Sequence, residues 1–418
     1  MPESPGGSVS VLRRWSTGGR TIPDTQRVYL LMFNATGRGG VARTVNTLAN
    51  RLADTHEVEI LSLLRTEEEP PYPIDPRVRI HWLLDNRNIN GRGGRRPRNN
   101  PAARQKWRRL DTSPSALEPD PGISALTDLL LRRSLPRLAP GVLISTRPML
   151  HLAAARWAPR HVLRIAQDHL NFPRRMSNPA VKALLDEAVP RMDAFVTLTD
   201  ADRVDYQRRY PGSRIRRIPN PSPFPRGEPA ALDAKVVVSA GRLVGEKGFD
   251  RLIDAWAPLA GDFPDWQLHI YGEGERRAEL EQQIAALGVG DSVLLKGYSR
   301  DFERVLADAG IYAMGSRIEG FPMVLLEAMS HGLPLVSFDC PRGPAEIVED
   351  GVNGRLVADH DVAGFTQALR EMLADDEQRR RMGAASYEQA ESYEIEPVAA
   401  QWERLFEDTL GTRFAPMP

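Results

Sequence analysis

Short apolar runs alternate with amphipathic stretches along most of the chain. In the first half, strands are predicted at residues 27–33, 56–64, 77–84, 141–145, 161–166 and 193–199. Continuous apolar runs such as 27–33 are typical of parallel strands that are buried on both faces. Helical periodicity covers residues 41–54, 123–138 and 200–210. The alternation predicts an α/β domain built on a parallel sheet.

The same rhythm returns after a proline-rich segment, residues 218–225, whose composition favours a stiff, extended connector. Beyond it, strands are predicted at 235–239, 266–271, 292–297, 310–314 and 334–338, and helices from about 249 and at 275–287 and 396–410. The predicted organisation is a disordered tail (1–25), a first domain (26–218), a linker (219–225), a second domain (226–394), and a final helix with a tail (395–418).

Composition narrows the class of protein only a little. The 418 residues carry 55 basic and 55 acidic side chains, so the chain as a whole does not attract polyanions. The single cysteine, Cys340, excludes an intramolecular disulfide and favours a reducing compartment. No apolar run approaches the length of a membrane span and no apolar signal core opens the chain, so we expect a cytoplasmic protein.

One basic segment interrupts the first domain. Residues 86–109 contain nine basic side chains and no acidic one. We predict that they belong to a flexible insertion that covers residues 86–121. Two interpretations stay open: solvated disorder, or attraction of Arg87 to Arg109 to an anionic surface, which would hold the protein at the inner face of the plasma membrane. Nucleic acid is not expected as a partner, because Trp107 is the only aromatic residue interleaved with the cations.

Two cations follow the predicted strand at 235–239. Arg242 and Lys247 stand in the segment Gly-Arg-Leu-Val-Gly-Glu-Lys-Gly-Phe, at the carboxyl end of that strand. Open α/β sheets bind ligands at this end, and the pair could clamp a diphosphate there. Glu319 and Glu327 flank a second turn, Gly320-Phe321-Pro322, which opens a helix whose free N–H groups would face the same anion.

The Gly-Arg-Leu…Lys-Gly-Phe segment and the two glutamates resemble the carboxyl-terminal domain of retaining glycosyltransferases of family 4. The resemblance implies the GT-B fold: two Rossmann-like, doubly wound domains facing across a cleft, with the last helix crossing back to the first domain. It implies that Arg242 and Lys247 hold the donor diphosphate, that Glu319 contacts the transferred sugar, and that Glu327 contacts the ribose. It also places these residues at the substrate: Gly39, Gly40, Gly272, Gly297, Tyr298, Gly320, Phe321, Pro322, Met323 and Val324.

The first domain offers further candidates. The turn at 37–40 ends in Gly39-Gly40 and lets a ligand approach backbone N–H groups. Glu57 and Glu59 follow at about the spacing of a ribose-binding acid, which keeps a nicotinamide site as an alternative. His169 comes directly after a predicted strand; family members often carry a histidine here against the sugar or the acceptor, so it is assigned to the catalytic group. Asp168 is a candidate to orient an acceptor hydroxyl, whereas His151 and His161 are interpreted as structural.

Two Asp-x-Asp sequences, 200–202 and 359–361, could suggest a metal site. Both begin predicted helices, so helix capping explains them, and no metal is expected. Arg342 and Glu346 lie in a loop similar to one in family members that build cell-surface polysaccharides or glycosylate teichoic acids; the cleft and a capping role are both open for Glu346.

The function that the resemblance implies is retaining transfer of a hexosyl group from a nucleotide sugar, UDP-linked by frequency in the family. The acceptor is expected to be a cell-envelope glycan, a lipid-linked glycan or a polyol phosphate, and no cofactor is expected beyond the nucleotide sugar. The alternatives are a non-catalytic nucleotide-sugar binding protein, and a GT-B epimerase or phosphorylase, because one fold hosts several chemistries.

Overall fold

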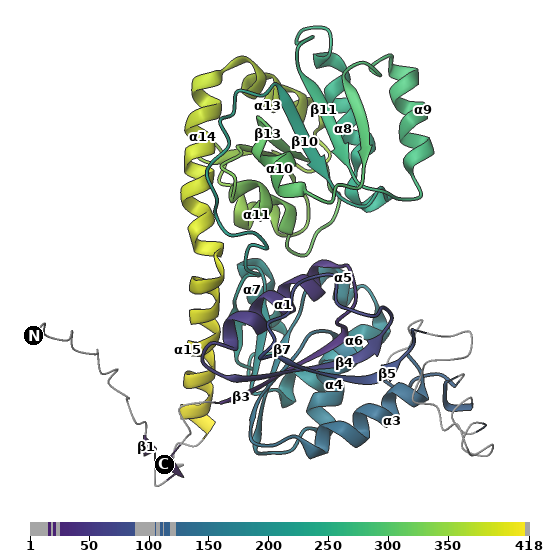
Figure 1. The fold of residues 1–418 in the computed structure, drawn as a ribbon, viewed down its shortest axis with the longest axis vertical. Coiled ribbons are helices and arrows are strands. Elements are labelled where there is room, and N and C mark those ends of the chain that lie inside the picture. Colours follow the sequence, from purple (N-terminus) through teal and green to yellow (C-terminus); the bar gives the residue numbers. More distant parts are fainter. Residues whose placement is uncertain are drawn as a thin grey trace, which may run out of the picture.

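The computed structural model describes residues 16–17, 20–21, 26–87, 105, 109–111, 113–117 and 123–413. Two α/β domains lie one above the other, and two consecutive carboxyl-terminal helices, α14 (Asp376–Gln389) and α15 (Ile395–Arg413), run along one side of them (Figure 1). The short strands β1 (Ser16–Thr17) and β2 (Arg20–Thr21) pair antiparallel ahead of the first domain. No helix of the described residues is long and apolar enough to cross a bilayer.

The first domain is built on a seven-stranded parallel sheet. Its strands, in spatial order, are β5 (Arg79–Asp85), β4 (Glu57–Arg65), β3 (Arg27–Asn34), β6 (Gly141–Ser145), β7 (Val162–Gln167), β8 (Ala194–Thr197) and β9 (Ile215–Arg217). Its helices are α1 (Gly40–Leu52), α3 (Ala125–Ser134), α4 (Pro148–Trp157), α5 (Phe172–Met176), α6 (Pro179–Ala188) and α7 (Asp200–Arg209).

Side chains of β3 alternate between the two faces of this sheet, as a strand requires. Tyr29 and Leu31 pack into the core under α3, α4 and α6. Leu30 and Met32 pack into the opposite core, under α1 and the carboxyl-terminal helix. Because both faces are covered, the strand must be apolar throughout, which is why it reads as a continuous run.

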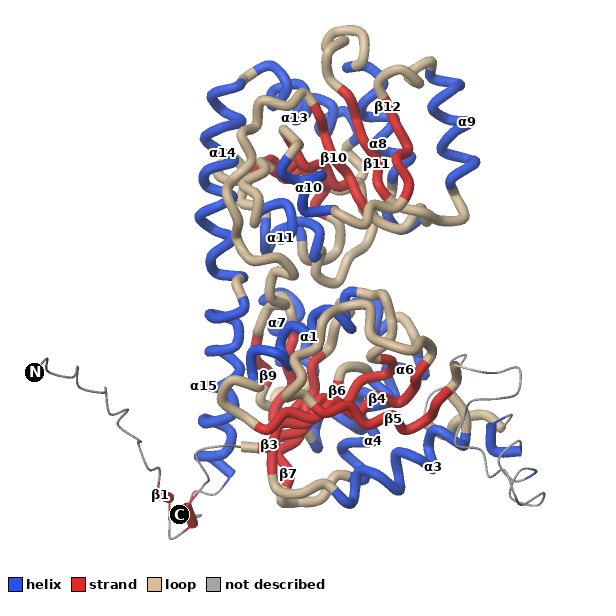
Figure 2. Tube along the Cα trace, viewed as in Figure 1, coloured by secondary structure: helices blue, strands red, loops and turns tan. Residues whose placement is uncertain are grey.

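The second domain has a six-stranded parallel sheet. Its spatial order is β12 (Val293–Gly297), β11 (Gln267–Tyr271), β10 (Val236–Ala240), β13 (Ile311–Met314), β14 (Leu335–Asp339) and β15 (Gly354–Ala358). Helices α8 (Phe249–Trp256), α9 (Arg277–Leu287) and α13 (Val362–Ala374) cover one face, while α10 (Phe302–Ala307), α11 (Met323–Met329) and α12 (Pro344–Ile347) cover the other. Figure 2 shows the helices outside both sheets.

Strand order reverses once in each sheet, between β3 and β6 in the first and between β10 and β13 in the second. Ligands of open α/β sheets bind beside such a reversal, at the carboxyl ends of the strands. The loops that leave these ends meet each other between the domains: the Asn171 side chain donates to the carbonyl of Glu319 at 2.6 Å. The loop after β3 also meets this region, since a Cβ on Gly40 would lie 3.8 Å from Met323 Cγ, so the two reversal points face each other across the domain boundary.

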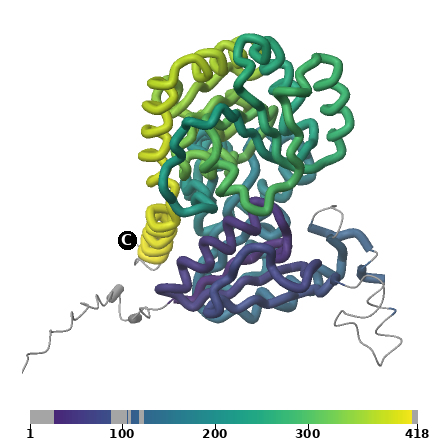
Figure 3. Tube along the Cα trace, turned by 45° about the horizontal axis from the view of Figure 1, so that its top comes forward, coloured from purple at the N-terminus to yellow at the C-terminus, as the bar shows by residue number. Residues whose placement is uncertain are grey.

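The last helix ties the domains together. After α14 (Asp376–Gln389) in the second domain, α15 (Ile395–Arg413) crosses back and lies beside α1 (Figures 1 and 3). Val398, Trp402 and Phe406 of α15 are buried in the core that β3 and α1 form. The predicted GT-B architecture, with its crossing helix, is confirmed.

The exact residues at which the domains, the tail and the insertion begin and end remain predictions. Most of the predicted amino-terminal tail and most of the insertion at 86–121 lie outside the described residues, as does the greater part of the proposed contact with an anionic membrane. Arg87, at the start of that segment, is described and pairs with Asp85 at 2.7 Å.

Candidate active site

The loop after β10 reaches the loop after β13 because Gly248 has no side chain. Gly248 adopts a left-handed backbone (φ +59°), and a Cβ there would lie 1.9 Å from the carbonyl oxygen of Gly315. Only glycine permits this approach. The contact brings Lys247, in the first loop, beside Glu319, in the second.

Lys247 and Glu319 form an ion pair at the cleft. Lys247 Nζ lies 2.6 Å from Glu319 Oε1, and the two side chains are 25% and 10% exposed. The hydroxyl of Ser316 donates to the same oxygen at 2.6 Å. The sequence assigned these two side chains to different parts of one donor, and the structure brings them into direct contact.

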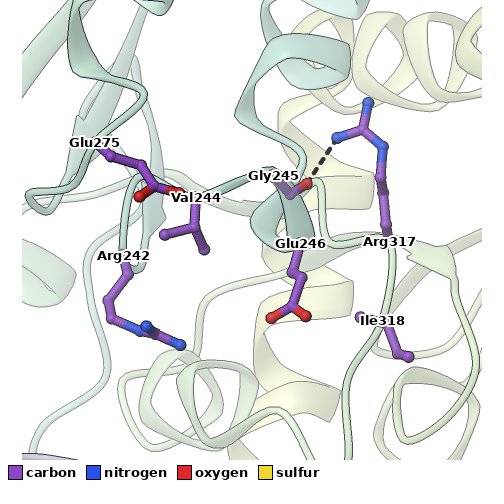
Figure 4. A pocket seen from close by; sticks show the side chains of 7 residues that line it. All are labelled: Arg242, Val244, Gly245, Glu246, Glu275, Arg317 and Ile318. Carbon is purple, nitrogen blue, oxygen red and sulfur yellow. Dashed lines mark hydrogen bonds between the residues drawn. The ribbon is translucent and has the colours of Figure 1, made fainter. Parts of the chain in front are cut away.

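Arg242 extends into a cavity of about 520 Å³ on the second domain. In Figure 4 the guanidinium of Arg242 and the carboxylate of Glu246 both point downward, and Glu275 lies above Arg242. Arg317 donates to the carbonyl of Gly245 at 3.0 Å. Arg242 is exposed and has no ion pair with any described residue. Its charge is therefore available to an anionic ligand.

The turn at 320–322 leads into α11, whose first residue is Met323 and whose N-cap is Pro322. No side chain caps this end of α11. Phe321 is buried against Tyr393, and Met323 lies under Gly40 of the first domain, where a Cβ on Gly40 would be 3.8 Å from Met323 Cγ. Val324 is partly buried in the same cluster. The helix is only seven residues long, so its dipole contributes little beyond the local N–H groups.

Glu327, the fifth residue of α11, is buried and meets a cation from the other domain. Arg43 Nη1 of α1 lies 2.7 Å from Glu327 Oε1, and the Glu327 side chain is 7% exposed. Burial raises the pKa of Glu327 to about 7, although the charge of Arg43 acts to lower it. Sequence reasoning placed Glu327 at the site but missed Arg43, because a cation in a helix does not disclose a partner 284 residues away.

His169 lies at the cleft with its ring unpartnered. Both ring nitrogens are buried without a hydrogen-bond partner. Burial lowers the pKa of His169 to about 4, so the imidazole is neutral at neutral pH. Its carbonyl oxygen would be 2.7 Å from a Cβ on Gly320, which places the His169 loop against the Gly320 turn across the cleft. His151 hydrogen-bonds to Ser145 Oγ, and His161 to the Leu138 carbonyl.

Asp168 does not orient an acceptor, contrary to the prediction. Its side chain is 1% exposed and pairs with Arg175 at 2.6 Å. The hydroxyl of Tyr206 donates to it at 2.8 Å. The carboxylate is thus fully used inside the first domain, where it fixes α5 against α7.

The nicotinamide alternative is also wrong in its geometry. Glu57 and Glu59 lie at the amino end of β4, opposite the first residues of β3, whereas the glycine turn follows the carboxyl end of β3. They pair with Arg27 at 2.9 Å and with Arg79 at 2.7 Å. Neither carboxylate can reach a ribose held at the turn.

Four of the predicted glycine and tyrosine positions shape the cleft without a charged contact. Gly39 is the N-cap of α1 and is exposed. Gly272 follows β11, and a Cβ there would meet the Gly241 carbonyl at 1.8 Å, so the loops after β10 and β11 are in close contact next to Arg242. Gly297 ends β12 with φ +73°, and Tyr298 after it is 69% exposed.

The two Asp-x-Asp sequences serve helix ends and ion pairs. Asp361 caps α13 by accepting from Gly364 N at 2.8 Å, and Asp359 pairs with Arg251 at 2.7 Å. Asp200 pairs with Arg203 at 2.6 Å. Within the described part of the chain no group of three or more His, Cys, Asp or Glu side chains is suited to hold a metal ion.

The loop at 339–346 joins the two domains and also lies against the candidate site. Glu319 N donates to the Pro341 carbonyl and Arg342 N donates to the Glu319 carbonyl, both at 3.1 Å. Arg342 lies 3.3 Å from Asp202 and also pairs with Asp205, both in α7. The Glu346 carboxylate accepts from the backbone N–H of Asp200 at 2.7 Å, so it caps α7 of the other domain. These contacts hold the two domains together.

Family models match both halves of this chain. Residues 38–222 match the model "Glycosyltransferase Family 4", and residues 224–389 match the model "Glycosyl transferases group 1". With the fold, these matches place the chain among the GT-B glycosyltransferases. More particularly, it joins a family 4 domain to a group 1 domain.

Curated relatives share these domains over part of their length. An exopolysaccharide phosphotransferase of Streptomyces coelicolor is 33% identical over 384 residues, which are 90% of this chain and 40% of that protein. An uncharacterized glycosyltransferase of Haemophilus influenzae is 34% identical over 219 residues, which are 52% of this chain and 62% of that protein. The chain thus spans less than two thirds of either relative.

Solved structures share the fold at low identity. TarM superposes with a TM-score of 0.73 at 16% identity, covering 91% of this chain and 98% of that one. The pneumococcal O-GlcNAc transferase GtfA, in complex with UDP and GlcNAc, gives a TM-score of 0.69 at 16% identity, covering 92% of this chain and 99% of that one.

Proposed function

We propose that this chain transfers a hexosyl group from a UDP-sugar to a hydroxyl of a cell-envelope glycan or polyol-phosphate acceptor, with retention of the anomeric configuration. The observation that carries the proposal is the group formed by Arg242, Lys247 and Glu319 beside the β10/β13 reversal, facing the His169 loop of the first domain.

The chemical demand is the charge on the departing diphosphate, which grows as the glycosidic bond breaks. Fixed cations stabilise that charge more in the transition state than in the ground state. Arg242 offers a planar fork of donors and Lys247 a point charge. When a donor binds, its phosphates compete with Glu319 for Lys247, which frees the Glu319 carboxylate to accept from sugar hydroxyls.

Retention follows if the acceptor attacks from the face that the diphosphate leaves. The bond from the anomeric carbon to the diphosphate oxygen breaks, the bond to the acceptor oxygen forms, and the acceptor proton passes to the departing diphosphate. To the neutral His169 ring, whose buried nitrogens have no partner, we assign a hydrogen bond to the sugar or the acceptor.

The names of relatives support the choice of donor and acceptor. GtfA was solved with UDP and GlcNAc, and an Anabaena protein, HepE, with UDP and glucose. A Staphylococcus aureus relative, 25% identical over 257 residues, is a poly(ribitol-phosphate) α-N-acetylglucosaminyltransferase. The phosphotransferase name of the Streptomyces relative describes a protein of which this chain matches 40%, so we do not transfer that activity to the matched part.

The test is nucleotide release from a panel of UDP-, GDP- and ADP-sugars, with and without a polyol-phosphate or lipid-linked acceptor. We expect acceptor-dependent UDP release, and an α-linked product from an α-linked donor by NMR. Lys247→Ala should abolish release with the fold retained, while Lys235→Ala, an exposed lysine paired with Asp265 in the same domain, should not.

Three results would overturn the proposal. Near-normal UDP release by Lys247→Ala would show that Lys247 does not hold the donor diphosphate. Donor binding without transfer to any acceptor would favour a binding protein. Conversion of the UDP-sugar itself into an isomer, without UDP release, would favour an epimerase.

A further inference from the structure

The Glu327 carboxylate has two oxygens in different situations. Oε1 accepts from Arg43 Nη1 at 2.7 Å. Oε2 has no hydrogen-bond partner among the residues that the structure describes. A carboxylate can accept several hydrogen bonds, so Glu327 retains the capacity to accept from a ligand hydroxyl while it stays paired with Arg43.

Two aromatic side chains contact the Arg43 guanidinium. Its guanidinium carbon lies 4.4 Å from the ring centroid of Phe224, in the linker, and 5.5 Å from that of Tyr72, in the first domain. Contacts of this kind fix a guanidinium plane and strengthen as water is excluded. Arg43 therefore presents a fixed cation to α11 from across the domain boundary.

Stability alone is a weak reason for such a pair. Desolvation of a buried ion pair commonly outweighs the attraction between its charges, so apolar side chains would serve packing as well. A buried acid whose pKa is displaced toward neutrality, paired with a cation across a domain boundary, is a candidate for a functional site. Glu327 is oriented by Arg43 through Oε1 and keeps Oε2 available, so it can accept a hydrogen bond from a hydroxyl of a diol such as ribose.

We propose that Arg43 is a positioning residue of the donor site: it orients Glu327 and keeps it ionised, so that recognition of the nucleoside hydroxyls requires both domains. The inference rests on the proposed function, in which Glu327 contacts the donor ribose. It adds that the first domain, through α1, sets the affinity for the nucleotide although it makes no contact with the ribose.

Four groups face Glu327 and set its charge. Arg43 from α1 favours the ionised form. Glu303 from α10 disfavours it, and the hydroxyls of Tyr72 and of Tyr312 in β13 sense its charge. A protonated Glu327 loses most of its power to accept from hydroxyls. Nucleotide affinity should therefore fall with decreasing pH, and loss of Arg43 should move that fall to higher pH.

The experiment measures UDP binding by calorimetry from pH 6 to pH 8.5 on the full chain. We expect Arg43→Gln to weaken UDP binding at pH 7 by roughly tenfold, the equivalent of one pKa unit, and to raise the pH of half-maximal affinity. Arg43→Lys keeps the charge, so its affinity and its pH profile should lie between those of Arg43→Gln and the unaltered chain. If the Gln variant does not fold, the comparison of Arg43→Lys with the unaltered chain tests the proposal. Arg51→Ala, on the same helix but paired with Glu396, should match the unaltered chain.

The outcomes separate the two proposals. If the unaltered chain binds UDP and both Arg43 variants bind it with the same affinity and the same pH profile, the role of Arg43 is overturned and the proposed function stands. If the unaltered chain binds no nucleoside diphosphate, the proposed function fails and this inference fails with it.

Discussion

Replacing Glu327 by glutamine should make the ligand-free protein more stable at high pH. Burial raises the pKa of Glu327 to about 7 from an ordinary 4.5. A carboxyl with a raised folded-state pKa contributes stability below its unfolded pKa and loses it as pH rises through its folded pKa. At about 1.4 kcal/mol per pKa unit, the wild-type chain loses about 3 kcal/mol between pH 4.5 and pH 8.

The Glu327→Gln variant keeps an acceptor for Arg43 and does not titrate. The difference in free energy of unfolding between this variant and the wild type should therefore grow by about 3 kcal/mol from pH 4.5 to pH 8. For a domain of this size, that corresponds to a shift of roughly 6–12 °C in melting temperature. Thermal unfolding without nucleotide at pH 4.5, 6, 7 and 8 measures it. Glu281→Gln, at a carboxylate 52% exposed in the same domain, should give a difference that hardly changes with pH.

A Glu327→Gln advantage that stays constant from pH 4.5 to pH 8 would refute the reasoning, because it would mean that Glu327 keeps an ordinary pKa in the folded chain. We also expect this variant to bind UDP weakly, so that stability and binding change in opposite directions. Such opposition is common where a site retains a strained or desolvated group.

Three further predictions concern the rest of the molecule. Treatment with EDTA should leave the rate of UDP release unchanged, since Arg242 and Lys247 carry the charge that a metal would otherwise supply; a loss restored by Mg²⁺ would contradict this. Arg342→Ala should loosen the apposition of the domains, seen as a larger radius of gyration in solution scattering that UDP partly reverses; an unchanged radius would count against the Arg342 contacts with Asp202 and Asp205. Burial raises the pKa of Cys340 to about 12, so a thiol reagent at pH 8 should modify it only after denaturation, and fast labelling of the native chain would show that the thiol is accessible.

Eleven of the thirteen strands that the structure describes in the two domain sheets were predicted from the sequence, whereas β9 and β15 were not. Amphipathic helices such as α1 and α15 were also predicted, but α6 was not, although it buries a single apolar face. Most strand bounds lie within two residues of those predicted, because a strand covered on both faces leaves an unbroken apolar signal. Helix α4 was not predicted: eight of its ten residues are buried, so it lacks the polar face that marks a helix by its periodicity. Helix α14 was missed for the opposite reason, since most of its residues are polar.

The candidate site was predictable mostly in its second-domain half, with Gly40 and His169 from the first domain. Arg242, Lys247, Glu319 and Glu327 stand in recognisable local segments, at strand and helix ends whose position follows from the α/β rhythm. The contacts between domains leave no such trace. Arg43 and Arg342 are ordinary helix and loop cations in the sequence, and Asp168 looked available because its partner Arg175 lies on a helix that the apolar pattern does not reveal.

The path of α15 also bears on how the protein folds during synthesis. Trp402 and Phe406 complete the core of the domain that leaves the ribosome first, yet they are translated after the whole of the second domain. The first domain must therefore wait, with part of its apolar surface uncovered, until these residues emerge. Expressing either domain alone would produce the same exposed surface, so the two are expected to behave as one unit in translation and in recombinant expression.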